Sequence, residues 1–196
     1  MSKKSDKPTR EEAEAAVRTL LGWIGDDPDR NGLKRTPLRV LKCYEEWFGG
    51  YEVDPAAELG STFADAAGYQ DIVALCNIDF ESHCEHHIAP FIGRAHVAYL
   101  PDKNVVGVSK LVKVVNAFAK RLQVQEKMTQ QIAECIHETL KPRATAVIIE
   151  AQHECMTTRG VYKKDIQMVS SSYLGEFATD AALKGEFLAI VERDKS

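Results

Sequence analysis

The sequence predicts an α+β fold in which a mainly antiparallel, four-stranded sheet is backed by two helices and preceded by an N-terminal helical extension. Three observations lead to this prediction. Four segments rich in β-branched and aromatic residues have the length and composition of strands. Apolar residues spaced three and four apart indicate amphipathic helices. Along the chain these segments follow the order ββααββ after the first helices, which is typical of an antiparallel sheet covered by helices.

The chain before residue 69 is expected to contain a polar tail and two helices. Residues 1–10 are polar and rich in lysine, which is typical of a disordered tail. In the helical segment, residues 11–68, one helix is expected from Glu11 and another from Thr36, with Thr36 as its N-cap and Pro37 at its first position. The apolar stripes that these helices should bury are Val17, Leu20, Leu21 and Ile24 in the first, and Val40, Tyr44, Trp47 and Phe48 in the second.

Residues 69–196 are expected to form the domain that carries the sheet. Strands are expected at residues 71–80, 92–100, 145–151 and 166–174, with a polar cluster at 81–87 interrupting the first pair. Ser109 is expected to cap the first of two consecutive helices, the second runs from about 124 to 140, and a closing helix covers 181–191.

The bulk composition argues against several classes of protein. The net charge of −4 and the pI of about 5.9 speak against a general affinity for nucleic acid, so we expect no nucleic-acid partner. The N-terminus is hydrophilic, and no segment approaches the roughly 18 apolar residues that span a bilayer, so we expect a cytoplasmic protein without a membrane partner. The odd number of cysteines, five, argues against a disulfide framework.

Two short segments carry the residue types that bind metal ions. Cys84 and His87 have C-x-x-H spacing, which allows both side chains to reach one ion from a single turn. Cys155 follows a predicted strand, two residues after His153. Three protein ligands, Cys84, His87 and Cys155, with water in the fourth position, form the pattern of a catalytic zinc site, and His86 and His153 would remain beside the metal for proton transfer. The alternatives are a chance occurrence of the C-x-x-H spacing and a Cys84–Cys155 disulfide.

Several motifs together give the sequence a family resemblance. They are Cys84-Glu-His-His87, Pro90-Phe91, Gly107-Val-Ser-Lys110, Arg121-Leu-Gln-Val-Gln-Glu126 and His153-Glu-Cys-Met-x-x-Arg-Gly160. In this order and spacing they resemble GTP cyclohydrolase I over roughly residues 12–192. The resemblance implies a tunnelling fold (T-fold) and one Zn²⁺ per subunit. It also implies the opening of the guanine imidazole ring of GTP by water, giving 7,8-dihydroneopterin triphosphate and formate, as the first step towards folate and related pterins. The family forms homodecamers with active sites at subunit interfaces.

The resemblance also implies roles for individual residues. His86 and His153 would transfer protons, and Glu126 would accept the two neighbouring N–H donors of guanine, with Gln125 in support. The residues expected to bind the triphosphate are Ser109, Lys110, Lys113, Arg159, Arg39 and Lys42, the last two from a neighbouring subunit. Lys113 stands where the family usually has arginine, and lysine keeps the charge but loses the two-pronged contact with phosphate.

Two other functions remain as alternatives. One is a related T-fold enzyme that acts on another purine or pterin, although such relatives carry three histidines or no zinc. The other is a non-catalytic module in which zinc only stabilises the fold, which would leave the spare histidines and the basic residues without a role. A zinc-dependent deaminase is disfavoured because the sequence has no Pro-Cys-x-x-Cys segment.

Overall fold

The computed structural model describes residues 7–60, 68–103 and 105–193, and the chain divides into two compact units, Met1–Phe48 and Gly49–Ser196. Both helices and strands are present, so the predicted α+β class is confirmed. Most of the predicted tail, and residues 61–67 of the predicted helical segment, lie outside the described residues.

The first unit consists of two helices, α1 (Arg10–Trp23) and α2 (Thr36–Trp47). Thr9 and Glu12 form a capping box, in which each residue's side chain accepts a hydrogen bond from the other's backbone N–H, so α1 begins one residue before the predicted start. The prediction of Thr36 as an N-cap is wrong. Arg35 occupies that position without a side-chain bond, and Pro37 lies in the first turn.

The apolar stripes of these two helices are less buried than their spacing predicts. Leu20 is 59% exposed, Ile24 65% and Trp47 39%, and Tyr44 is also exposed. No residue of α1 is buried, and Pro37 is the one buried residue of α2. The prediction was wrong for these four side chains, because two helices without a further layer enclose little surface.

The second unit is built on a five-stranded sheet with the order β3-β1-β2-β4-β5. Its long strands are β1 (Val73–Cys84), β2 (Pro90–Leu100), β4 (Ala144–His153) and β5 (Met168–Gly175), and each neighbouring pair among them is antiparallel. The fifth strand, β3 (Leu122–Gln123), was not predicted and pairs in parallel with the end of β1. Two residues are too few to carry a periodic signal, which is why the sequence predicted four strands.

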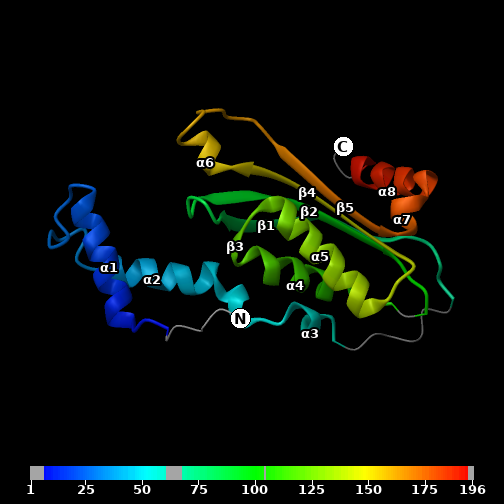
Figure 1. The fold of residues 1–196 in the computed structure, drawn as a ribbon, viewed down its shortest axis with the longest axis horizontal. Helices are drawn as coiled ribbons and strands as arrows, with labels where there is room; N and C mark the ends of the chain where they lie inside the picture. The colour runs from blue at the N-terminus through cyan, green and yellow to red at the C-terminus, as the bar shows by residue number, and fades with distance from the viewer. Residues whose placement is uncertain (1–6, 61–67, 104, 194–196) are drawn as a thin grey trace. The chain divides into compact units, whose positions relative to one another are not determined.

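Helices cover both faces of this sheet (Figure 1). On one face lie α4 (Val108–Ala119) and α5 (Gln125–Leu140), whose apolar residues pack on Phe91, Val97 and Tyr99. On the other face lie α7 (Glu176–Thr179) and α8 (Ala181–Arg193), which bury Phe177 and Phe187 against the sheet. Short elements complete the unit: η1 (Gly49–Glu52), α3 (Pro55–Leu59) and α6 (Glu154–Thr157).

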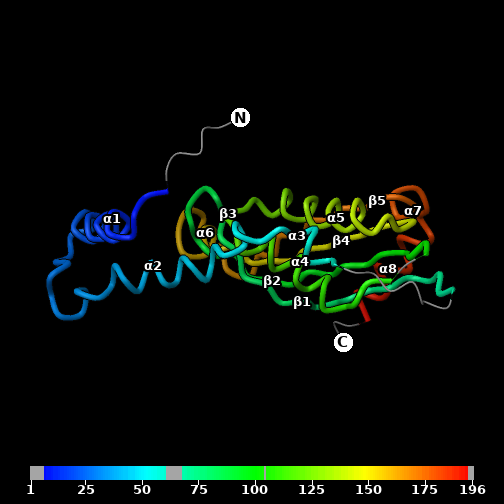
Figure 2. Tube along the Cα trace, turned by 90° about the horizontal axis from the view of Figure 1, so that it is seen from below, coloured from blue at the N-terminus to red at the C-terminus, as the bar shows by residue number. Residues whose placement is uncertain are grey.

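The two ends of the sheet differ. The turn between β1 and β2, strand β3 and α6 lie together at one end, and α7 lies at the other (Figures 1 and 2). Ser82 is fully buried and His83 is 4% exposed, and β1 continues to Cys84, into the polar cluster that was expected to interrupt it. Cys84, at the end of β1, is thereby held by the sheet itself.

Other predicted boundaries agree with the structure to within a few residues, with one error that concerns the site. Gly107, not Ser109, is the N-cap of α4, and Ser109 lies in the first turn of the helix. Among the described residues, every helix is too short or too polar to cross a membrane.

Candidate active site

A tight turn after β1 brings Cys84 and His87 together. The Cys84 N–H donates to the carbonyl of Ala89, and the Ile88 N–H donates back to the carbonyl of Cys84, both at 2.9 Å. Ile88 adopts a left-handed conformation with φ of 53°, which closes the turn. The Sγ of Cys84 and the Nδ1 of His87 are consequently 3.7 Å apart.

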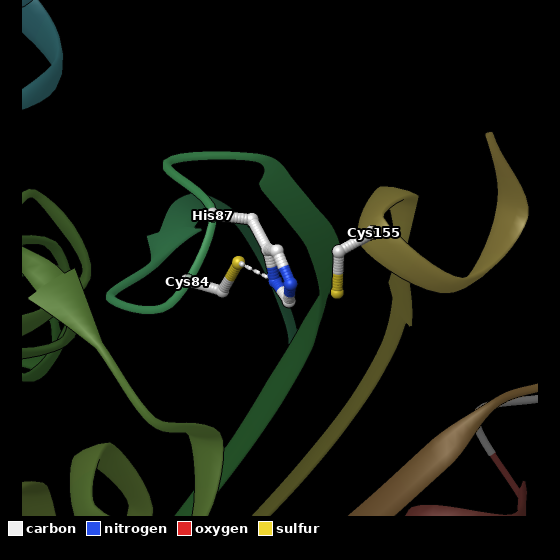
Figure 3. Close-up of side chains that lie close together, drawn as sticks. All are labelled: Cys84, His87 and Cys155. Carbon is white, nitrogen blue, oxygen red and sulfur yellow. Dashed lines mark hydrogen bonds between the residues drawn. The ribbon is translucent and has the colours of Figure 1, made fainter. Parts of the chain in front are cut away.

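Cys155 reaches the same point from another element. It lies on α6, directly after His153 ends β4. In Figure 3 its side chain points toward Cys84 and His87 across the gap between the two segments. One ligand atom from each of the three residues lies within 4.8 Å of the others, with Cys84 buried, Cys155 half-buried and His87 exposed. The three predicted ligands therefore form one group with an open side.

The electrostatics of this group suit a divalent cation. Burial raises the pKa of the Cys155 thiol, and the adjacent Cys84 raises it further. Two thiolates this close require a compensating positive charge, and two thiolates with one imidazole are donors that zinc prefers. The residues present therefore fit a zinc ion.

Arg159 lies beside the same group. Its Nη1 is 2.9 Å from the Nε2 of His87, and because guanidinium only donates, His87 accepts this hydrogen bond. Arg159 also opposes the rise in the pKa of Cys155. Arg159, which was predicted to bind phosphate, therefore lies beside the predicted metal ligands of its own chain.

His153 is held by two contacts. Its ring stacks on that of Phe91, with centroids 4.6 Å apart and planes inclined by 2°, and the two residues are direct partners across the β2–β4 ladder. Its Nε2 is 2.8 Å from Oε1 of Gln125. Burial lowers the pKa of His153, and the negative charge of Glu126 partly offsets this effect.

The remaining predicted site residues of this end differ in exposure. Gln125 and Glu126 occupy the first turn of α5, directly after β3, where the Gln123 carbonyl accepts from the N–H of Glu85. Gln125 is 1% exposed, whereas Glu126 is exposed. His86 is exposed on the turn, with its ring centroid 6.2 Å from that of His87.

The predicted phosphate ligands on α4 lie elsewhere. Just before α4, the Val106 N–H donates to the Tyr99 hydroxyl, and Tyr99 is paired with Val73 at the start of β1. At about 3.3 Å per residue, the start of β1 is roughly 35 Å from Cys84 at its end. The helix end that carries Ser109 and Lys110 therefore points away from the cluster.

Lys113 is already paired in this chain, since its Nζ lies 3.1 Å from a carboxylate oxygen of Glu58 on α3. Arg39 and Lys42 are exposed residues of α2, in the first unit. The structure therefore brings eight of the thirteen predicted residues to one end of the sheet, and they are Cys84, His87, Cys155, His86, His153, Gln125, Glu126 and Arg159.

Sequence reasoning assigned no individual role to three residues that shape the site. Phe91 supports the ring of His153, and Thr129 and Ser170 hydrogen-bond to Gln125. The register of the sheet would have revealed Phe91 as the partner of His153, but a register is not visible in a single sequence.

Comparisons with known proteins identify relatives of the chain. The family model described as GTP cyclohydrolase I matches residues 13–192. A protein of Maricaulis maris named GTP cyclohydrolase 1 is 57% identical over 187 residues, covering 95% of this chain and 91% of the relative. Relatives with the same name from Hyphomonas neptunium and Allorhizobium ampelinum are 57% and 51% identical, over 93% and 98% of this chain and 88% and 96% of their own lengths. The chain therefore belongs to the GTP cyclohydrolase I family.

Proposed function

We propose that this enzyme is a zinc-dependent GTP cyclohydrolase I. It would open the guanine imidazole ring of GTP with water and rearrange the product to 7,8-dihydroneopterin triphosphate, with release of formate, as the first step of folate and pterin biosynthesis in the cytoplasm. The observation that carries the proposal is the convergence of Cys84, His87 and Cys155 beside His153 and Glu126, in a chain of this family.

Cys84, His87 and Cys155 would hold one zinc ion per subunit through two sulfur atoms and one imidazole nitrogen. Zinc bound in this way lowers the pKa of water, which makes hydroxide available at neutral pH for attack on a carbon as unreactive as C8 of guanine. The exposed side of the group, formed by His87, leaves access for water and substrate.

Glu126 would recognise the base. Guanine presents its N1–H and its 2-amino group side by side, and one carboxylate accepts from both. Glu126 is exposed at the start of α5, and its charge acts on His153, so it lies within electrostatic reach of the group that would transfer protons. The guanine ring would then lie between the carboxylate and the histidines.

His86 and His153 would share the proton transfers of the reaction. Ring opening needs a proton at N7 of guanine and the removal of one from the attacking water, and the later rearrangement needs further transfers. Burial lowers the pKa of His153, which keeps this imidazole neutral and able to accept a proton at neutral pH. His86 is exposed on the turn and can exchange protons with solvent.

The triphosphate would be bound by residues from more than one copy of the chain. Arg159 lies beside the metal ligands, but Ser109, Lys110 and Lys113 are carried by the part of α4 that begins toward the other end of the sheet. In a homodecamer with the T-fold arrangement, these residues, together with Arg39 and Lys42, would complete the pocket of a neighbouring subunit. Lys113 would exchange the carboxylate of Glu58 for phosphate.

Two surfaces support such an assembly. β5 is an edge strand, and β3 covers only His83 and Cys84 of β1, so both edges of the sheet have backbone available for pairing. Trp23 is 82% exposed on α1, and other large apolar residues of the first unit are exposed with it.

The test is a direct assay. The purified protein, with its zinc content measured, is incubated with GTP, and formate and a pterin that becomes fluorescent on oxidation are quantified. Equal amounts of both products are expected. If the fully zinc-loaded protein releases neither, the proposal is wrong.

A further inference from the structure

We propose that Gln125 is a positioning residue for His153. The carbonyl groups of Ile149 and Met168, supported by the hydroxyl groups of Ser170 and Thr129, fix the orientation of the Gln125 side chain. The side chain of Gln125 would hold the imidazole by its Nε2–H and leave Nδ1 for the reacting groups. This proposal rests on the proposed function of the site. The orienting role of Gln125 follows from the directions of the hydrogen bonds around its side chain.

The orientation of the Gln125 amide follows from its neighbours. The amide nitrogen lies 3.1 Å from the carbonyl oxygens of Ile149 and Met168. Carbonyl oxygens only accept hydrogen bonds, so the NH₂ group must face them. The amide oxygen, Oε1, is then the atom that lies 2.8 Å from Nε2 of His153. Because this oxygen also only accepts, His153 must donate, and its Nε2 carries the proton.

Two hydroxyl groups hold the other side of Gln125. The hydroxyl of Thr129 donates to the backbone carbonyl of Gln125 at 2.8 Å, which uses the only hydrogen of that hydroxyl. The Oγ of Ser170 is 2.7 Å from the Oγ1 of Thr129, so Ser170 must be the donor of this pair. The same Ser170 oxygen is 3.1 Å from the amide nitrogen of Gln125, which has two hydrogens for three acceptors, so Ser170 accepts a hydrogen that it shares with one of the two carbonyl oxygens. Every hydrogen bond in the network therefore has one direction.

Burial separates this role from substrate binding. Gln125 and Thr129 are each 1% exposed, so the Gln125 side chain reaches the reaction only through His153. Phe91 fixes the plane of the imidazole by stacking, and Gln125 fixes its rotation within that plane. Together they leave one ring nitrogen, Nδ1, for exchange with the reactants.

The experiment compares Gln125→Met and His153→Ala, singly and combined, by zinc content, KM for GTP and kcat. Gln125→Met keeps the length of the side chain but removes its hydrogen bonds. We expect kcat to fall roughly ten- to a hundredfold, the range typical of groups that orient site residues, with zinc content and KM unchanged. In the His153→Ala background, Gln125→Met should cause no further fall, because the ring that it orients is gone.

Two more variants keep the test decisive. Ser170→Ala is a milder change that should lower kcat severalfold through the same network, and it replaces Gln125→Met if that variant fails to fold. Thr145→Val is the matched control: Thr145 is fully buried and hydrogen-bonded to His137 at 3.1 Å, at the other end of β4, so its loss should affect stability but not kcat.

The outcomes separate the two proposals. The positioning role is wrong if wild-type protein turns over GTP and Gln125→Met retains the wild-type kcat. It is also wrong if Gln125→Met lowers kcat by the same factor in the wild-type and His153→Ala backgrounds. In both cases the proposed function stands. If wild-type protein does not turn over GTP, the proposed function fails first.

Discussion

Replacing Cys155 by serine tests the metal site most directly. The substitution keeps the size of the side chain approximately but exchanges a good zinc donor for a poor one. Four-ligand zinc sites bind with about 10–16 kcal/mol, so one thiolate contributes about 3 kcal/mol, which corresponds to a loss of roughly a hundredfold or more in zinc affinity at neutral pH.

The pH dependence of that loss can be worked out from the site. The pKa of the Cys155 thiol is raised above its ordinary value of 9.0, chiefly by burial, so at neutral pH the thiol carries a proton that zinc must displace. Zinc affinity therefore rises with pH up to this raised pKa. Zinc binding to Cys155→Ser releases one proton fewer than zinc binding to the wild type. The difference in zinc-binding free energy between the two proteins should therefore grow by about 1.4 kcal/mol for each pH unit between 6.5 and 8.5.

The assay is a zinc titration against a coloured competing chelator at several pH values. Cys135→Ser is the matched control, because Cys135 is a half-buried cysteine of α5 whose pKa is also raised chiefly by burial. It should leave both the zinc affinity and its pH slope unchanged. If Cys155→Ser has the same zinc affinity and pH slope as Cys135→Ser, Cys155 is not a zinc ligand and the assignment of the metal site is wrong.

Three further predictions follow from the geometry. His153→Ala should retain zinc, measured by elemental analysis, but lose most turnover, and retained turnover would refute its role in proton transfer. Glu126→Gln exchanges a carboxylate for a single neutral acceptor, so KM for GTP should rise roughly tenfold or more, as expected for about 1.5–3 kcal/mol of charged hydrogen bonding, and an unchanged KM would remove Glu126 from guanine recognition. In Gly93→Ala the new methyl group would overlap the Glu150 carbonyl and lie 2.6 Å from Cα of Ala151, so the free energy of unfolding should fall by about 3 kcal/mol. The control is Gly185→Ala, in an open position of α8, which should raise the free energy of unfolding by about 0.5–1 kcal/mol. Equal effects of the two substitutions in thermal unfolding would contradict the packing of β2 on β4.

The long strands and helices could be predicted from the sequence because their apolar residues recur at regular spacing on the face that packs against the core. Leu111, Val114, Val115 and Phe118 are all buried on α4, as their spacing predicts. The same reasoning ends β1 too early, because a polar run interrupts the apolar pattern of the strand. Ser82 is in fact buried, with its hydroxyl 3.5 Å from the Arg121 carbonyl, and a partner almost forty residues away in the sequence cannot be seen in a local pattern.

In the site, too, contacts between residues close in the sequence could be predicted, and contacts between residues far apart could not. The C-x-x-H spacing was enough to bring Cys84 and His87 together, because a single turn joins them. The approach of Cys155 depends on the β2–β4 register, and the orientation of His153 depends on contacts with Phe91 and Gln125. For these, motifs could indicate which residues matter but not how they meet.

The β1–β2–β4 pairing has a consequence for how the protein would acquire a metal ion. The cluster draws on two distant stretches of chain, and Cys84 and Cys155 are separated by about seventy positions, so they meet only after β1, β2 and β4 have paired. In a zinc finger, ligands close in sequence let the ion drive folding, whereas here the order of events would be reversed. We expect zinc uptake during refolding to lag behind formation of the sheet, so that a bound ion marks a chain that has already finished folding.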